Sequence, residues 1–421
     1  MKVFVLNSGS SSIKFQLFDC VGAPAALAKG VVERIGLAGS RLTCACSRAP
    51  HNPSCPAKRV AADVPDHATG IKLVCNCLLN KACGLLDRLD EVAGIGHRVV
   101  HGGESFTESV RITEVVIDAI ENCVKLAPLH NRPALMGIRA GTEVFPNVPQ
   151  VAVFDTAFHQ TLPRHRYLYA APLEFYEEYG VRKYGFHGIS HQYVARKAAR
   201  LLGTGPERLK AITCHLGNGS SITAVDSGKS VDTSMGFTPL SGVMMGSRSG
   251  DLDPYIPLFL HTEAGIELNR IPEVLNKESG LKGVCRLRDV RDVLAGAERG
   301  DKQCRLALDM FVYRLAAYIG AYWVILGGPD AIVFTAGIGE NVPEVRRRVL
   351  EKFRFLGVTV DEAKNAENAV DISGKNTSVR VLVIPTNEEL VIAQETARIV
   401  DALDAAGAAT RRDQSALPRP P

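Results

Sequence analysis

Two stretches of the chain share one pattern of apolar and polar positions. Residues 3–6 are apolar, the polar turn Asn7-Ser8-Gly9-Ser10-Ser11-Ser12 follows, and apolar side chains then return at every second position over 13–17. Residues 211–225 repeat this layout, with a Gly/Asn/Ser turn between two apolar segments. Alternation of this kind is typical of half-buried strands. Each stretch therefore predicts a β-hairpin.

The turns of both hairpins are rich in small polar residues. Backbone N–H groups in a concave turn attract anions, and Lys14 adds a positive charge on the returning strand of the first hairpin. This pattern indicates that the hairpins bind nucleotide phosphates, although an ordinary Ser/Gly hairpin would have the same local sequence. Gly9 and Gly219 lie 210 positions apart in a chain of 421 residues. That repeat favours a duplicated domain, as in actin-like ATPases and sugar kinases, with a nucleotide cleft between the two copies.

Strands alternate with helices along the rest of the chain, which predicts an α/β fold. Residues 39–66 have no clean period and are expected to form a surface insertion, 235–254 form a long loop, and residues from 405 on form a disordered tail. The expected strands are 92–100, 151–154, 331–334 and 379–384. The expected helices are 71–90, 112–126, 191–202, one or two over 298–326, one from 343, and 387–403.

Length and composition narrow the class of protein. A chain of 421 residues suits two domains, and 46% hydrophobic and 22% charged residues are usual for a globular protein. The net charge of +4 argues against a dedicated nucleic-acid binder. The apolar stretch 315–328 is short for a membrane span, and no signal peptide is evident. We therefore expect a cytoplasmic protein that binds no membrane.

Cysteines are frequent, with six of the eleven between Cys44 and Cys83. The pairs Cys44/Cys46 and Cys75/Cys77 have C-x-C spacing rather than the C-x₂-C spacing of common zinc sites. A metal site and ordinary reduced thiols both stay open as explanations.

Several polar residues stand where chemistry could occur. Gly337-Ile338-Gly339-Glu340-Asn341 lies between a strand and a helix, where a helix N-terminus can meet phosphates or an adenosine. A dinucleotide fingerprint would need a third glycine where the chain has Val342, and no G-x-x-x-x-G-K-[ST] motif occurs. Arg98 and Arg248 could bind carboxylate or phosphoryl oxygens, or could be surface charges. Asp155 ends a buried strand, so it could hold a metal, act on a reacting group, or cap a helix.

Eight blocks of sequence, taken together and in order, resemble the signatures of the acetate kinase family. The resemblance covers roughly residues 1–403, and its blocks are 6–14, 96–103, 153–159, 184–191, 214–221, 246–254, 334–341 and 385–389. It implies two ribonuclease H-like domains, namely 1–155 completed by the helix 387–404, and 156–386.

The resemblance also implies roles in catalysis and metal binding. Asp155 matches the active-site aspartate of the family, and His187 and Arg248 match the pair assigned to the transition state. Asn7 and Glu388 match the positions linked to Mg²⁺, for which Mn²⁺ can substitute. The implied reaction is reversible phosphoryl transfer from ATP to acetate, which gives acetyl phosphate and ADP. Because acetate is already ionised at pH 7, Asp155 is expected to act on Mg²⁺ and geometry rather than as a base.

Substrate positions follow from the same match. Arg98 corresponds to the arginine that holds the acetate carboxylate. The apolar pocket for the methyl group corresponds to Val100, Leu129, Phe186 and Pro239. The nucleotide positions correspond to Lys14, His215, Leu216, Gly217, Asn218, Gly219, Asp289, Val290, Arg291, Gly337, Ile338, Gly339, Glu340 and Asn341. Residues 285–291 depart from the family, because the usual Ser-rich lead into Asp-x-Arg is replaced and is one residue shorter.

Two other functions fit parts of this pattern. A propionate kinase of the same family would need a larger pocket, and Val100 favours acetate. A non-catalytic actin-like ATP-binding module would have both hairpins but no need for Arg98, His187 and Arg248. Family analogy also implies a homodimer through the second domain.

Overall fold

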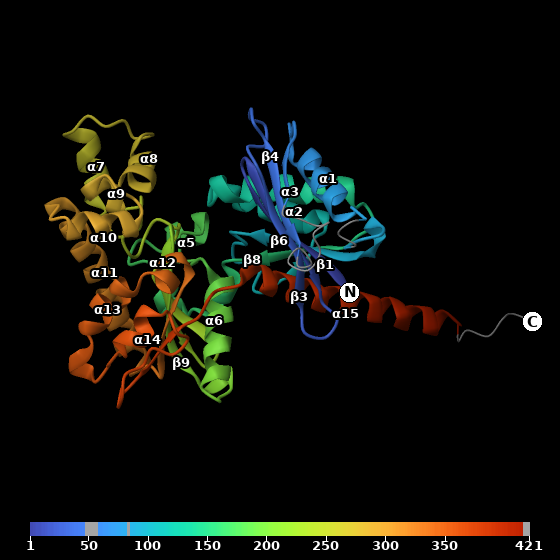
Figure 1. The fold of residues 1–421 in the computed structure, drawn as a ribbon. Coiled ribbons are helices and arrows are strands. Elements are labelled where there is room, and N and C mark those ends of the chain that lie inside the picture. Colours follow the sequence, from blue (N-terminus) through green and yellow to red (C-terminus); the bar gives the residue numbers. More distant parts are fainter. Residues whose placement is uncertain (47–57, 82–84, 416–421) are drawn as a thin grey trace, which may run out of the picture. The chain divides into compact units, whose positions relative to one another are not determined.

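The chain folds into two compact units, each built on one β-sheet (Figure 1). The computed structural model describes residues 1–46, 58–81 and 85–415. Unit 1 comprises Met1–Ala157 and Asn387–Pro421, and unit 2 comprises Phe158–Thr386. The boundaries expected from sequence, after residues 155 and 386, lie within two residues of these. Mixed helices and strands in both units confirm the predicted α/β class.

The sheet of unit 1 has eight strands in the order β5-β4-β3-β2-β1-β6-β8-β7. β1 runs parallel to β6, and β6 runs parallel to β8, so these three strands deliver their carboxyl ends to one edge of the sheet. The strands are β1 (Lys2–Gly9), β2 (Ser12–Asp19), β3 (Ala25–Glu33), β4 (Arg41–Cys46), β5 (Lys58–Ala61), β6 (Val92–Val99), β7 (Val110–Arg111) and β8 (Gln150–Phe154).

β1 and β2 form the first predicted hairpin. They pair antiparallel from Lys2 opposite Asp19 to Gly9 opposite Ser12, so only Ser10 and Ser11 make the turn. Ile13, Phe15 and Leu17 are buried in the core of unit 1, whereas Lys14 between them is exposed. The alternation read from the sequence thus places Lys14 on the polar face.

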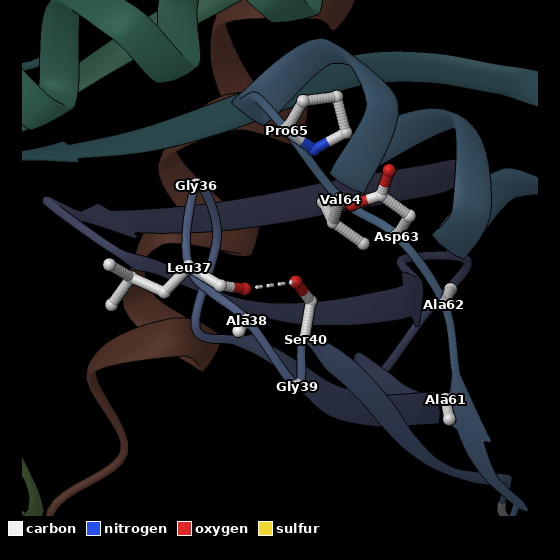
Figure 2. A pocket seen from close by; sticks show the side chains of 10 residues that line it. All are labelled: Gly36, Leu37, Ala38, Gly39, Ser40, Ala61, Ala62, Asp63, Val64 and Pro65. Carbon is white, nitrogen blue, oxygen red and sulfur yellow. Dashed lines mark hydrogen bonds between the residues drawn. The ribbon is translucent and has the colours of Figure 1, made fainter.

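The prediction that residues 39–66 form a surface insertion is partly wrong. Within 39–66, β4 and β5 extend the sheet from β3, and Leu42 and Cys44 are buried in the core. Figure 2 shows a hollow between 36–40 and 61–65, where Ser40 Oγ donates to Leu37 O at 2.9 Å. No residue predicted for the site lines this hollow.

Helices cover both faces of the unit 1 sheet. Ile95 packs with side chains of α1 and α3, whereas its neighbours Gly94 and Gly96 face the opposite side and meet α15. A Cβ on Gly96 would lie 2.4 Å from Thr396 Oγ1 and 2.5 Å from Ile392 Cγ2, so glycine permits this close packing. The helices are α1 (His67–Leu78), α2 (Glu114–Asn122), α3 (Pro128–Val144) and α15 (Glu388–Ser415).

Two expected helix ends differ from the structure. The helix expected over 71–90 stops at Leu78, because the chain folds back so that Leu86 N donates to Leu78 O at 3.3 Å. The C-terminal helix continues to Ser415 instead of ending near 403. The part of the disordered tail predicted over 405–415 is therefore helical, and 416–421 lie outside the described residues.

The sheet of unit 2 has five strands in the order β11-β10-β9-β12-β13. Antiparallel β9 and β10 form the second predicted hairpin, and β12 and β13 add parallel strands beyond β9. The order β3-β2-β1-β6-β8 in unit 1 has the same sequence of antiparallel and parallel pairings. The strands are β9 (Lys210–Leu216), β10 (Ser220–Asp226), β11 (Lys229–Thr233), β12 (Ala331–Thr335) and β13 (Arg380–Val383).

Two helices pack against opposite faces of this sheet. Side chains of α6 join one apolar cluster with β9, β12 and β13, and side chains of α11 join the larger cluster on the other face. The helices of unit 2 are α4 (Arg164–Tyr167), α5 (Glu174–Tyr179), α6 (Gly188–Leu201), α7 (Tyr255–Thr262), α8 (Ile271–Glu273), α9 (Gly280–Cys285), α10 (Val290–Glu298), α11 (Lys302–Leu326), α12 (Ala336–Asn341), α13 (Pro343–Glu351) and α14 (Glu362–Ala366).

Helix α11 contains the longest apolar stretch of the sequence. Among the described residues it is the one helix whose length and composition would also suit a membrane span. Its residues Phe311, Leu315 and Ile319 are buried in the core of unit 2, as expected for a core helix. The helix ends at Leu326 and is capped by Gly327, whose φ of 66° is the left-handed conformation that glycine adopts readily at a helix end.

Candidate active site

The first hairpin presents Asn7 and Lys14 side by side. They are direct partners across β1 and β2, immediately before the turn. His67, the first residue of α1, supports this turn because its Nε2 donates to Gly9 O at 2.8 Å. The hairpin thus offers an amide and an ammonium group from a turn that is fixed by a neighbouring helix.

Arg98 and Asp155 form a bidentate ion pair at the carboxyl ends of β6 and β8. Arg98 Nη2 lies 2.7 Å from Asp155 Oδ2, and Arg98 Nε lies 3.2 Å from Asp155 Oδ1. Glu388 approaches the same guanidinium at 3.6 Å. Although burial opposes the charge, Asp155 and Glu388 raise the pKa of Arg98, which keeps it cationic. One edge of Arg98 is therefore engaged, and its Nη1–Nη2 edge has the shape to bind a substrate carboxylate.

The carboxylates around Arg98 suit a hard divalent cation. Mg²⁺ is usually held by one or two carboxylates together with substrate phosphates. Asp155, which is 1% exposed, and Glu388 supply such oxygen donors on one side of Arg98. Across the described ranges no group of three or more His, Cys, Asp or Glu is arranged to hold a metal. The donor set therefore fits a cation shared with a phosphate ligand better than a fully protein-bound metal.

In unit 2, His187 stands at the start of α6 in an unusual backbone conformation. Its φ is 58°, which is left-handed and costs a non-glycine residue about 1–2 kcal/mol. His159 supports the preceding peptide, because its Nε2 donates to Phe186 O at 2.9 Å. Burial lowers the pKa of His159 to about 4, so this support is a neutral imidazole. Backbone strain held by such contacts is common at functional sites.

The second hairpin brings His187 and Arg248 together. A Cβ placed on Gly219 would lie 3.4 Å from Arg248 Nη1 and 3.5 Å from His187 Nε2. The glycine therefore leaves a small space that is faced by a guanidinium and an imidazole nitrogen. These are donor groups of the kind that bind phosphoryl oxygens.

Arg248 is a partly buried cation without an acidic partner in the described part of the chain. Its Nη1 donates to Pro239 O at 3.1 Å, and burial lowers its pKa without removing the charge. A partly buried guanidinium without a carboxylate is costly unless an anion binds to it. The long loop predicted over 235–254 carries both residues.

His215 connects the second hairpin with the start of α6. Its ring stacks on His187 with centroids 4.1 Å apart, and its Nδ1 lies 2.8 Å from Ser190 Oγ. Gly217 in the turn approaches Ala336, so that an added Cβ would lie 3.8 Å from the Ala336 Cβ. The structure therefore brings the phosphate loop predicted over 215–219 next to the second nucleotide loop.

The second nucleotide loop is itself a short helix, α12, which the sequence pattern did not predict. Glu340 folds back over its beginning and accepts from Ala336 N at 2.7 Å and from Thr386 N at 3.1 Å. Its carboxylate therefore caps backbone groups. Gly337 has open space beside it, which leaves its backbone accessible to a ligand.

Arg346 in α13 supports this loop from inside the protein, and it was missed by the sequence analysis. It is fully buried, and burial lowers its pKa to about 10. Nη1 donates to Gly339 O at 2.8 Å and to Glu340 O at 3.0 Å. Nε and Nη2 donate to Asn365 and Asn368. All five N–H groups are thus satisfied, and no local sequence pattern distinguishes such an arginine from a surface one.

We expect Arg346→Met to destabilise the protein by about 3 kcal/mol or more, because several buried acceptors lose their donor. It should also raise the KM for ATP, the nucleotide that the family resemblance implies, with little change in the KM for the implied acceptor, acetate. Urea unfolding and steady-state kinetics measure the two effects. Arg346→Lys, which restores three of the five donors, should be intermediate. An unchanged ATP KM in a folded Arg346→Met protein would contradict the role assigned to Arg346.

For the remaining predicted site residues, the contacts in the structure say less about a ligand. Asp289 caps α10, and Arg291 donates to it at 2.6 Å and lowers its pKa to about 2. Val290 is 1% exposed, so neither its side chain nor its backbone presents appreciable surface to a nucleotide. Among the predicted methyl-pocket residues, Phe186 is also buried, and nothing of the Leu129 side chain is described. The nucleotide role of 289–291 and the apolar pocket stay predictions.

The four described cysteines of the cysteine-rich segment lie in elements that carry no predicted site residue. Cys44 and Cys46 lie in β4, and Cys75 and Cys77 lie in α1. Burial raises the pKa of Cys75 to about 12, so its thiol is protonated at neutral pH. Cys55 and Cys83 fall outside the described residues.

Each unit has a β-sheet that begins with a Gly/Ser hairpin. Unit 1 adds an Arg–Asp pair at its strand ends, and unit 2 adds a His–Arg pair beside a glycine. These features are those of a phosphotransferase-like architecture. Comparison with known proteins identifies the family. The model of the acetokinase family matches residues 2–394. The chain belongs to the acetokinase family, whose members are phosphotransferases with a carboxyl group as acceptor.

Several relatives match over nearly their whole length. An acetate kinase of Halothermothrix orenii is 51% identical over 404 residues, which is 95% of this chain and 100% of that protein. An acetate kinase of Thermotoga maritima is 51% identical over 407 residues, covering 95% and 99%. The crystal structure of Porphyromonas gingivalis acetate kinase superposes with a TM-score of 0.88 at 41% identity, covering 95% and 99%. A propionate kinase from Francisella tularensis gives 0.88 at 40% identity, covering 94% and 99%.

Proposed function

We propose that this protein is an acetate kinase, which transfers the γ-phosphoryl group of ATP directly to the carboxylate of acetate. The observation that carries the proposal is the meeting of His187 and Arg248 at Gly219, within a chain of the acetokinase family. Incubation with ATP, acetate and Mg²⁺, followed by trapping of the product with hydroxylamine, tests it. Acetyl hydroxamate should form only when all three components are present.

Unit 2 supplies the groups for the moving phosphoryl group. Phosphoryl transfer depends mainly on positioning and on neutralising charge. The backbone of the 215–219 turn receives the phosphates, and Arg248 and His187 donate to the phosphoryl oxygens as negative charge builds on them. The site needs no general base, because the acetate carboxyl group is already ionised at neutral pH.

Unit 1 supplies the groups for acetate and for the metal. The Nη1–Nη2 edge of Arg98 binds the acetate carboxylate, while Asp155 fixes the other edge. Asn7 and Glu388 would hold Mg²⁺, and Asp155 would steer the cation. Lys14 would contact the ATP phosphates. The cation, when bound, neutralises phosphate charge; Mn²⁺ has similar coordination and would substitute.

We expect Arg98→Ala to raise the KM for acetate by about 10- to 100-fold, because a bidentate contact to the substrate carboxylate is lost. The KM for ATP should change little. Since the substitution also removes the guanidinium that pairs with the buried Asp155, Arg98→Lys is the matched variant that retains a charge beside Asp155. If the acetate KM stayed constant in both variants while kcat fell, Arg98 would belong to the transition state instead.

Propionate is the second candidate substrate, because the structure is also similar to that of a propionate kinase. One extra methylene group in an apolar pocket changes kcat/KM by roughly 10- to 200-fold. With Val100 narrowing the pocket, kcat/KM for acetate should exceed that for propionate within this range. Equal values, or a preference for propionate, would reverse the assignment.

We also propose that the protein acts as a cytoplasmic homodimer. Helix α7 exposes Tyr255, Leu258 and Phe259, which are 64%, 47% and 52% exposed. Large apolar side chains gathered in this way are typical of an interface. Light scattering should give twice the chain mass of 45.4 kDa, and Leu258→Glu combined with Phe259→Glu should give monomers.

A further inference from the structure

A chain of hydrogen bonds leads away from His187 into the interior of unit 2. His187 Nδ1 lies 2.8 Å from Ser221 Oγ, and Ser221 Oγ lies 2.7 Å from His191 Nε2. His191 Nδ1 lies 2.7 Å from Thr213 Oγ1, which donates to Thr223 O at 3.4 Å. Ser221, His191 and Thr213 have no exposed surface.

The last acceptor in this series of hydrogen bonds, Thr223 O, determines on which atom each hydrogen lies. A carbonyl oxygen only accepts, so the Thr213 hydroxyl gives its hydrogen to Thr223 O and accepts from His191 Nδ1. Burial, with the nearby His159 and His215 rings, lowers the pKa of His191 well below its usual value. The neutral His191 ring then has a bare Nε2, which accepts from Ser221. Ser221 Oγ in turn accepts from His187 Nδ1.

We propose that His191 is a positioning residue for the reaction, and that through Ser221 it fixes the hydrogen of the neutral His187 ring on Nδ1. The inference rests on the proposed function, in which His187 Nε2 faces the transferring phosphoryl group. A neutral His187 of this tautomer offers only a lone pair there. It donates to a phosphoryl oxygen only as the imidazolium, so His187 works as a cation beside Arg248.

This assignment makes activity dependent on pH in a defined direction. The groups that face His187 are His215 from β9, His191 from α6, Arg248 from the 235–254 loop, and His159 through Phe186 O. Of these, Arg248 carries a charge at neutral pH and opposes protonation of His187, whereas bound phosphate favours it. As pH rises, the imidazolium is lost and kcat falls.

Thr213 and Thr223 provide a matched pair of variants. They are direct partners across β9 and β10, and both are fully buried. The Thr213 hydroxyl contacts His191, whereas the Thr223 hydroxyl contacts Thr233. Thr213→Val removes the acceptor for His191 Nδ1, so the hydrogen of the His191 ring should move to Nε2. The direction of the hydrogen bonds through Ser221 should then be reversed. The neutral His187 ring should then carry its hydrogen on Nε2. Thr223→Val should leave these hydrogen bonds unchanged.

The test is nitrogen-15 NMR of the histidine rings in the full chain, with the His187 signals assigned by their loss in His187→Asn. In the unsubstituted protein and in Thr223→Val, Nδ1 should carry the hydrogen of neutral His187. In Thr213→Val, Nε2 should carry it, and the fall of kcat at alkaline pH should be lost. In Ser221→Ala, kcat should fall by roughly 10- to 100-fold, as is usual when an orienting contact is removed, with an unchanged acetate KM.

A hydrogen on Nε2 in the unsubstituted protein would overturn the proposal. So would the same tautomer and the same pH profile in Thr213→Val and Thr223→Val. If Thr213→Val does not fold, the tautomer of the unsubstituted protein decides alone. Because NMR needs no substrate, an Nδ1–H ring in a protein that makes no acetyl phosphate would refute the proposed function and leave the tautomer assignment intact.

Discussion

Arg248→Ala should lower kcat by about 10³-fold, which is the effect expected when a guanidinium that stabilises a transferring phosphoryl group is removed. Arg248 has no acidic partner in the described part of the chain and faces the space beside Gly219 together with His187. The KM values for acetate and ATP should change much less, because the interaction strengthens only in the transition state. Steady-state kinetics over both substrates measures this difference.

Arg166→Ala is the matched control for this substitution. Arg166 is also a partly buried arginine of unit 2 that donates to a backbone carbonyl, Val231 O, at 2.9 Å. It lies outside the predicted site, so its loss should affect stability more than kcat. Equal losses of kcat in the two variants would show that Arg248 acts through packing rather than on the phosphoryl group.

Asp155→Asn should have a comparably large effect, with activity reduced by about 10³-fold or more and a higher Mg²⁺ concentration needed for half-maximal rate. The amide cannot balance the charge of Arg98, from which the carboxylate is 2.7 Å away, and it is a weaker ligand for a hard cation. Titrating Mg²⁺ at saturating ATP and acetate measures the shift.

Asp232→Asn controls for the loss of a partly buried ion pair in general. Asp232 lies 2.6 Å from Lys183 and has 13% of its side chain exposed. Its substitution should leave the magnesium dependence unchanged. If Asp155→Asn lost activity but retained the original magnesium dependence, Asp155 would act in another way, for instance in proton transfer.

Local patterns were enough to predict the two hairpins and the strand ends that the candidate site uses, but not helix α12. Both hairpins follow from strict alternation around a polar turn, and Asp155 follows from its place after a buried strand. The edge strands β4 and β5 were not predicted, because an irregular stretch with prolines resembles a loop until it pairs with β3. Helix α12 is too short to show a helical period.

Contacts between distant segments explain what the sequence could not show in the site. Arg346 reaches Gly339 and Asn365 through the interior, and a charged residue in an amphipathic helix usually predicts a surface position. The contacts of His191 with Thr213 and Ser221 join α6 to two strands. Neither arrangement has a spacing that could be read along the chain, whereas the family resemblance predicts roles for the residues that these contacts support.

The most direct test of phosphoryl transfer to acetate is phosphorus-31 NMR of the reaction with doubly ¹⁸O-labelled acetate. Attack of the carboxylate on the γ-phosphorus predicts acetyl phosphate whose phosphorus carries one ¹⁸O, formed in equal amount to ADP. Label in acetyl adenylate, formed together with pyrophosphate, would show attack on the α-phosphorus instead. Release of unlabelled phosphate with ADP, and no acetyl phosphate, would show an ATP-hydrolysing module and contradict the proposal.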